Sequence, residues 1–304
     1  MPARNAIFLF GAALIWGVAF VAQSVGMDYM GPFAFNALRF LLGSAVLLPV
    51  ILYRGRRGAG DRKKEAAATA DRKRTVLAGV FCGCCLFMAS MSQQIGIMTT
   101  DVGKAGFLTA MYIVIVPALS FAVTRRTSLR LWLSVLLACA GLYCLSISDS
   151  LVPESGDIWL IACAFLFSMH IMCIDHFADV DGVKLSCIQF LTAGILAAGG
   201  CVLREGAYFR LEGGGLLSVM YAGIMSCSVA YTFQILGQQG ADPGAASLIL
   251  SLESVISVIA GFVILHQTLT MRELLGCLIM FIAIILVQLP AGAAERGADA
   301  DNSF

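Results

Sequence analysis

The chain has little charge. Asp, Glu, Lys and Arg make up 13% of its 304 residues, whereas 59% of the residues are hydrophobic. The mean hydropathy of +0.88 lies far above that of a soluble globular domain. Because 20 basic residues nearly balance 19 acidic ones, the composition implies no nucleic-acid partner. The shortage of charge therefore indicates a protein of the lipid bilayer, with room for about ten spans of roughly 20 residues each.

The sequence also lacks the usual motifs of ATP-driven pumps and of membrane-embedded enzymes. It contains no Gly-x4-Gly-Lys-Ser/Thr loop that would cradle a phosphate, no HExxH and no Asp-rich metal motif. Its three histidines leave few groups for acid–base chemistry near neutral pH. These absences argue against a pump and an enzyme, and they predict a protein without a cofactor. A sensor or channel is a third alternative, although no soluble signalling domain or filter-like loop is visible.

Cysteine is plentiful but shows no pairing pattern. The eleven cysteines are odd in number and nearly all lie inside apolar runs. A buried free cysteine behaves as a small hydrophobic residue, so we interpret them as packing residues. The Cys82–Cys85 cluster has neither a second cluster nor a nearby histidine to complete a metal site.

Ten apolar runs follow one another along the chain. In lipid, each segment must satisfy its own backbone polar groups, so each run is predicted to be a transmembrane helix. The sequence thus predicts an all-α polytopic membrane protein with ten spans. They are Ile7–Val25, Phe33–Tyr53, Val76–Ile95, Val102–Val123, Leu131–Ile147, Ile158–His176, Leu185–Leu203, Leu216–Leu236, Gly244–Leu265 and Leu274–Leu289. With nine spans after it, the first run is interpreted as a retained helix and not as a cleaved signal peptide.

The basic residues predict the orientation. Fifteen of the 20 Lys and Arg fall on one side of the predicted spans, nine of them in the loop Arg54–Arg74, and three fall on the other side. By the positive-inside rule, both termini, this basic loop and a flexible tail over 291–304 are cytoplasmic. The acidic loop Ser148–Asp157 is then outside. A basic loop of this kind can also attract anionic lipid.

The two halves of the chain repeat one another weakly. Arg39 and Phe40 match Gln189 and Phe190 at an offset of 150, and Ala78-Gly79 matches Ala222-Gly223 at an offset of 144. Because the matches keep their order, we predict two five-helix repeats, over residues 5–148 and 157–290. Five spans are an odd number, so the second repeat enters the membrane inverted. Secondary transporters often have this plan, with a site near the midplane.

Several motifs resemble those of a known transporter family. They are ALIWGVAFV at Ala13–Val21, LRF at Leu38–Phe40, AGFLTAMYIVIVP at Ala105–Pro117, and SLESVISVIAGFVILHQTLT at Ser251–Thr270. With these motifs the chain resembles the EamA-type ten-helix transporters of the drug/metabolite transporter superfamily over residues 5–290. The resemblance implies a transporter of small metabolites, often amino acids or related compounds and commonly moved outward.

The stretches Thr99–Pro117 and Gly240–Gly261 hold the main candidate site residues. The second carries Glu253 where the first carries Tyr112, near the middle of the span. An ionised carboxylate at that depth needs a partner or takes up a proton. It could therefore bind an ammonium group or carry a proton, and the alternative is a buried glutamate that fixes helix packing.

Two basic residues also lie inside spans. Lys104, in the outer half of span four, could meet a substrate carboxylate or Glu253, or it could snorkel to the interface. Arg39 lies in the outer half of span two. A partner such as Asp28 or Asp101 would give it a structural role, since intramembrane charges usually pair.

Further candidates come from polar and aromatic residues in the spans. Trp16 in span one aligns with Phe167 in span six, and Tyr231 aligns with Phe87, so these rings could line a cavity between the repeats. The remaining candidates are Gln94 and Gln238 near the ends of spans three and eight, and His170 in span six, each with helix packing or anchoring as the alternative.

The sequence therefore predicts a secondary transporter of the plasma membrane that moves a small metabolite by alternating access. A multidrug or nucleoside transporter of the same fold is an alternative. The expected partners are a small-molecule substrate, the lipid bilayer and, as an option, protons as coupling ions. A chain of ten helices with two repeats can act as a monomer, and a homodimer is also open.

Overall fold

The structure is a bundle of helices. It is a computed structural model that describes residues 1–57, 63–100, 102–125, 128–146, 155–206, 211–265 and 270–289. The helices of the first repeat are α1 (Ala3–Met27), α2 (Pro32–Arg57), α3 (Lys63–Ile97), α4 (Val102–Ala110), α5 (Tyr112–Thr124) and α6 (Leu129–Ser146). Those of the second are α7 (Asp157–His176), α8 (Gly182–Arg204), α9 (Gly213–Met220), the π-helix η1 (Tyr221–Tyr231), α10 (Thr232–Gln238), α11 (Pro243–Leu250), α12 (Leu252–Leu265) and α13 (Met271–Gln288).

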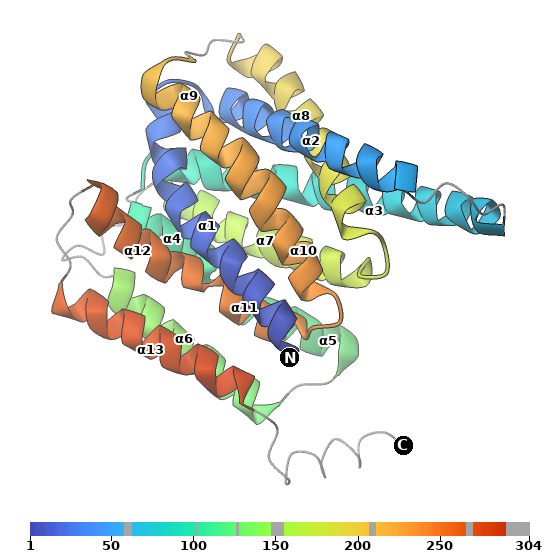
Figure 1. Ribbon diagram of the computed structural model, residues 1–304. Coiled ribbons are helices and arrows are strands. Elements are labelled where there is room, and N and C mark those ends of the chain that lie inside the picture. Colours follow the sequence, from blue (N-terminus) through green and yellow to red (C-terminus); the bar gives the residue numbers. More distant parts are fainter. Residues whose placement is uncertain are drawn as a thin grey trace, which may run out of the picture.

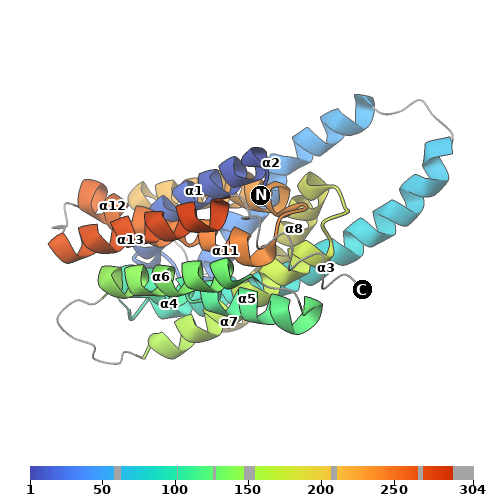
Figure 2. The ribbon, with the colours of Figure 1, turned by 90° about the horizontal axis from the view of Figure 1, so that it is seen from below.

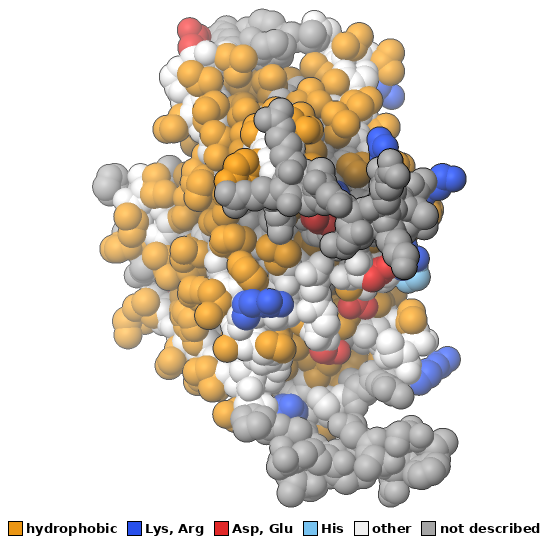
Figure 3. Space-filling view, turned by 45° about the vertical axis from the view of Figure 1, so that its right-hand side comes forward, with side chains coloured by type: hydrophobic (Ala, Val, Ile, Leu, Met, Phe, Trp, Pro, Cys, Tyr) orange, Lys and Arg blue, Asp and Glu red, His pale blue; other side chains and the backbone are white. Residues whose placement is uncertain are grey.

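The helices have the length and composition of membrane spans. In the part of the chain that the structure describes, nine spans are long and apolar enough to cross a bilayer, and Leu129–Cys144, at the place of the predicted fifth span, is a shorter apolar helix. Figure 3 shows hydrophobic side chains over the upper part and the left-hand side of the visible face. Large apolar residues such as Ile7, Leu52 and Leu203 are exposed, as expected where the surrounding solvent is lipid. The predicted ten-helix membrane fold is confirmed.

The two repeats interleave within one bundle. The closest helix pairs join one repeat to the other: α2 packs on α8, α6 on α13, α3 on α7 and α8, and α1 on α12. In Figure 1, α6 and α13 lie together at one edge, and α2 and α8 lie at the opposite edge. The repeats are therefore not two separate lobes, and any cavity at the centre is lined by both.

Residues that match between the repeats meet in space. The rings of Phe40 and Phe190 stack with their centroids 6.1 Å apart and their planes 7° apart. Likewise, the Tyr112 hydroxyl donates a hydrogen bond to Glu253 Oε1 at 2.9 Å. In an arrangement with two-fold symmetry, residues near the axis contact their own counterparts. Both contacts are therefore those expected of a duplicated, inverted chain.

Two spans are broken at corresponding points. A single turn residue, Met111, separates α4 from α5, and Ser251 separates α11 from α12. Both residues keep right-handed backbone angles, with φ near −60° and ψ near −12°, so the spans change hydrogen-bonding pattern without unwinding. Nothing in the sequence analysis predicted these breaks. They place Tyr112 and Glu253 at the start of the second segment of each broken span.

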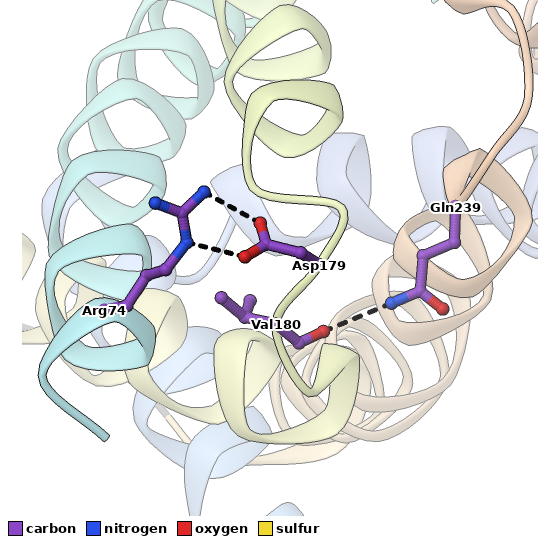
Figure 4. A network of polar contacts seen from close by, with 4 residues as sticks. All are labelled: Arg74, Asp179, Val180 and Gln239. Carbon is purple, nitrogen blue, oxygen red and sulfur yellow. Dashed lines mark hydrogen bonds and ion pairs between the residues drawn. The ribbon is translucent and has the colours of Figure 1, made fainter. Parts of the chain in front are cut away.

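Helices extend into the predicted basic loop from both sides, since α2 ends at Arg57 and α3 begins at Lys63. These helix ends project beyond the rest of the bundle (Figure 2). At the base of this projection, Arg74 of α3 forms a two-bonded ion pair with Asp179, which follows α7, at 2.6 and 2.9 Å. Gln239 donates to the neighbouring Val180 carbonyl at 3.2 Å, so the turn is held from both sides (Figure 4).

The ion pair between Arg74 and Asp179 is exposed to solvent. The hydrogen bonds from Arg74 lower the pKa of Asp179 below its usual value. The pair is therefore complete at neutral pH and is lost only as the pH falls through that lowered value. Because both side chains are about half exposed, salt screens the pair and it adds little stability. Residues 58–62 of the basic loop, most of the acidic loop and the tail over 291–304 lie outside the described residues.

Candidate functional site

A small cavity lies where the two repeats meet. Its volume is about 30 Å³, which holds on the order of two water molecules. Seven helical segments of the first and second repeats contribute to its wall, besides the broken span of α11 and α12. The lining residues are Trp16, Phe20, Gln23, Arg39, Gln93, Tyr112, Phe167, Ile171, Ser226, Tyr231, Gln234, Leu250 and Glu253.

Glu253 is the acidic residue of this lining. Its side chain is 6% exposed, and Oε1 accepts the hydrogen bond from the Tyr112 hydroxyl. Among the described residues, no Lys or Arg forms an ion pair with it. A buried carboxylate without a cation is costly. The cavity therefore presents a carboxyl group that can hold a proton or be balanced by a cationic ligand.

Arg39 is the basic residue of the lining, and it is 2% exposed. Its Nε donates to Asn36 Oδ1 at 2.8 Å and its Nη1 donates to Gln23 Oε1 at 2.9 Å. The guanidinium also lies over the Phe40 ring, 4.7 Å from the centroid. Asp28 does not pair with Arg39, and Asp101 lies outside the described residues. Among the described residues Arg39 has no carboxylate partner, and the amide oxygens of Asn36 and Gln23 accept its hydrogen bonds.

Aromatic rings close the cavity on one side. Trp16 and Tyr231 meet edge to face with their centroids 4.6 Å apart, and Trp16 Nε1 lies 3.4 Å from the Ser226 carbonyl oxygen, to which it donates. Phe167, which the repeat aligns with Trp16, also lines the cavity. The structure therefore brings together both matched aromatic residues of spans one and six, together with Tyr231.

The π-helix η1 places Ser226 and Tyr231 in this wall. A π-helix has i→i+5 hydrogen bonds, is rare, and is frequently found at functional sites. Here it lies between α9 and α10 of span eight and packs on α1 and α2. No residue pattern in the sequence distinguishes this segment from an ordinary apolar helix, and the sequence analysis did not predict it.

Lys104 lies elsewhere. Its Nζ forms an ion pair with Asp157 Oδ2 of α7 at 2.8 Å, and both side chains are 18% exposed. Lys104 is not part of the cavity wall, so the structure does not bring it together with Glu253. Instead it ties α4 to the first turn of α7, at the end of the bundle opposite Arg74.

The two predicted glutamines do not line the cavity. Gln94 and Gln238 are buried behind the wall, where each donates to a backbone carbonyl of a neighbouring helix: Gln94 to Gln23 O at 3.3 Å, and Gln238 to Ile171 O at 3.2 Å. These matching bonds fix helix packing. The glutamines that line the cavity are Gln93 and Gln234, which the sequence analysis did not select as site residues.

His170 stands directly behind the aromatic wall. Its Nε2 lies 3.1 Å from Gln189 Oε1, and its ring meets the Tyr231 ring edge to face at 5.9 Å. It is fully buried but does not line the cavity. In the described ranges, no group of three or more His, Cys, Asp or Glu side chains could hold a metal ion.

The fold is that of a polytopic helical membrane protein, and the cavity puts polar side chains at its centre. Comparisons with known proteins identify the class of this membrane protein. A model of the EamA-like transporter family matches residues 4–147 and again residues 154–289. The chain belongs to the EamA-like transporter family.

Individual proteins are also similar to the chain. A protein of Archaeoglobus fulgidus, described as an uncharacterized transporter, is 28% identical over 279 residues, which cover 91% of this chain and 83% of that protein. A protein of known crystal structure aligns with a TM-score of 0.77 and 18% identity, over 95% of this chain and 97% of its own. At that identity, the second likeness concerns the fold alone.

Proposed function

We propose that the chain is a secondary transporter that moves a small metabolite, an amino acid or related compound, out across the plasma membrane. The observation that carries this proposal is the central cavity with Arg39 and Glu253 in its wall. Ionisable residues inside a membrane bundle are costly, and they mark substrate or ion pathways. If Arg39 and Glu253 served only helix packing, there would be no reason for both side chains to line the same cavity.

Transport requires the cavity to open and enlarge. A volume of about 30 Å³ is too small for a metabolite. In our proposal the structure is a constricted state between two states with a larger, open cavity. The substrate enters when helices separate at one end of the bundle, and it leaves when they separate at the other end.

The packing suggests which helices move. α2, α3, α8 and η1 pack on one another, whereas α4, α5, α11 and α12 form a second set together with α6 and α13. α1 and α7 contact both sets. We therefore assign the motion to these two mixed sets, with α1 and α7 between them. The basic residues place both termini in the cytoplasm in this proposal, and one chain supplies the whole cavity wall, which favours a monomer.

The test is a flux assay in proteoliposomes. Labelled amino acids, aromatic amines and nucleosides are supplied one at a time, with and without a pH gradient. We expect saturable flux of the amino acid class, and a response to the gradient would add proton coupling. Flux of amines or nucleosides instead would favour the multidrug or nucleoside alternatives. Absence of flux for every class, in protein that remains folded, would contradict the proposed function and favour a sensor.

A further inference from the structure

Arg39 has an unused hydrogen-bond donor. Its Nε and Nη1 atoms are bonded to Asn36 and Gln23, but Nη2 has no partner although the atom is buried. Buried polar groups almost always find partners, and a charged donor left alone is expensive. Since Arg39 lines the cavity, the missing partner is expected to come from what enters it.

The two bonded amides are themselves held in place. Asn36 turns its amide nitrogen towards α3, where it lies 3.4 Å from the Ser90 carbonyl oxygen and 3.1 Å from Met91 Sδ. Its oxygen is therefore directed at Arg39. The Gln23 backbone carbonyl is bound by Gln94, which fixes that part of α1. The guanidinium is thus preorganised on α1, α2 and α3, which lowers the entropic cost of binding an anion.

The unused donor fits a carboxylate better than a phosphate. A guanidinium matches a carboxylate in shape and charge, and one free nitrogen suffices to anchor one oxygen. A phosphate dianion would need further cations. In the described lining Arg39 is the basic side chain, and an ionised Glu253 would repel a doubly charged phosphate more strongly than a singly charged carboxylate.

Glu253 supplies a negatively charged group to the same cavity as Arg39. Its carboxyl group has a neutral donor, the Tyr112 hydroxyl, and no cation among the described residues. An ammonium group in the cavity would balance it, just as a carboxylate would balance Arg39. A ligand that carries both groups leaves neither buried charge unpaired.

We propose that Arg39 Nη2 binds the carboxylate of the transported metabolite and that Glu253 binds its ammonium group. The substrate is then a small zwitterion of the amino acid type, oriented between α2 and α12. This assignment rests on the proposed transport function and adds which end of the substrate each residue holds.

The test compares each amino acid with analogues that lack either the carboxylate or the ammonium group. L-Alanine, L-threonine and L-phenylalanine are used next to their methyl esters, which lack the carboxylate, and their N-acetyl derivatives, which lack the ammonium. Each compound competes against the labelled parent in proteoliposomes and is also tested for raising the melting temperature of the purified protein. We expect the transported parent to compete at least about tenfold better than either analogue, because each analogue leaves one buried charge unpaired.

Variants of Arg39 assign the carboxylate end. Arg39→Gln is expected to lose the preference for the parent over its methyl ester, while the preference over the N-acetyl derivative is kept. Arg39→Lys should recover part of the first preference, because it keeps the charge without the fork that reaches Gln23 and Asn36. The matched control is Arg204→Gln, at an exposed position where α8 ends, which should behave as the unchanged protein does.

Different results overturn different parts. If a parent amino acid is transported but its methyl ester competes equally well, the Arg39 assignment is wrong and the transport function stands. An Arg39→Gln protein that still rejects the ester overturns the assignment as well. If Arg39→Gln does not fold, the analogue competition on the unchanged protein decides alone. Absence of any flux or thermal shift with all three amino acids, amines and nucleosides would contradict the transport function itself.

Discussion

Glu253→Gln is expected to reduce transport by on the order of tenfold or more. The amide oxygen of glutamine can still accept the Tyr112 hydrogen bond, so the packing between α5 and α12 should survive. What is lost is the negative charge that balances a cationic group in the cavity. Removing one partner of a buried, hydrogen-bonded charge pair costs roughly 2–5 kcal/mol, which is a factor of about 30 or more in affinity.

The measurement is the initial rate of counterflow at several values of external pH. If Glu253 also carries a coupling proton, the glutamine variant should lose its response to a pH gradient together with its rate. Glu212→Gln serves as the control, because Glu212 is exposed next to the start of α9 and lies outside the cavity wall. A Glu253→Gln protein with unchanged rate and pH profile would show that this carboxyl group serves packing only.

Gly17→Leu is expected to disrupt the bundle. A Cβ atom at position 17 would lie 2.4 Å from Ile256 Cβ and 2.8 Å from the Glu253 carbonyl oxygen. These atoms belong to the backbone or are fixed to it, so they cannot move aside as the end of a long side chain could. α1 would have to shift away from α12, and overpacking of this kind costs roughly 1–3 kcal/mol. The shift would also part Trp16 from the other residues of the cavity wall.

We expect a melting temperature several degrees below that of the unchanged protein, measured on detergent-purified samples by the loss of monodisperse protein on heating. Gly199→Leu is the matched control, since a Cβ at that position on α8 meets nothing within 4 Å. Equal melting temperatures for the two leucine variants would contradict the close packing of α1 against α12.

The fold was largely predictable because lipid imposes a simple rule. Every backbone polar group must be satisfied within its span, so length and hydropathy suffice to locate helices. The breaks at Met111 and Ser251 follow no such rule. Both residues keep nearly helical angles, and neither carries the signature of glycine or proline. The π-helix over Tyr221–Tyr231 could not be predicted either, because its apolar residues are equally compatible with an α-helix and with a π-helix.

The candidate site was harder to predict than the fold. Glu253, Arg39 and Tyr112 were found because charge and hydroxyl groups stand out in an apolar span. The direction in which each of these side chains points could not be predicted, because a helix that is apolar on all sides gives no periodic signal for the side that faces a cavity. Gln93 and Gln94 are neighbours in sequence, yet one lines the cavity and the other binds a carbonyl behind it. Lys104 could not be assigned without knowing that α7 begins with Asp157 beside it.

The most direct test of transport through this cavity is its accessibility from the two sides of the membrane. Ser226 lies in the cavity wall on η1 and is 2% exposed, so Ser226→Cys is a small change. A membrane-impermeant maleimide is added to one face or the other of vesicles of known orientation. Labelling at position 226 is read by peptide mass spectrometry, so the eleven native cysteines do not interfere.

Alternating access predicts that position 226 is labelled from either face and that a transported amino acid slows the labelling from both. Labelling from one face alone under every condition, or from neither, would contradict a pathway through the centre of the bundle.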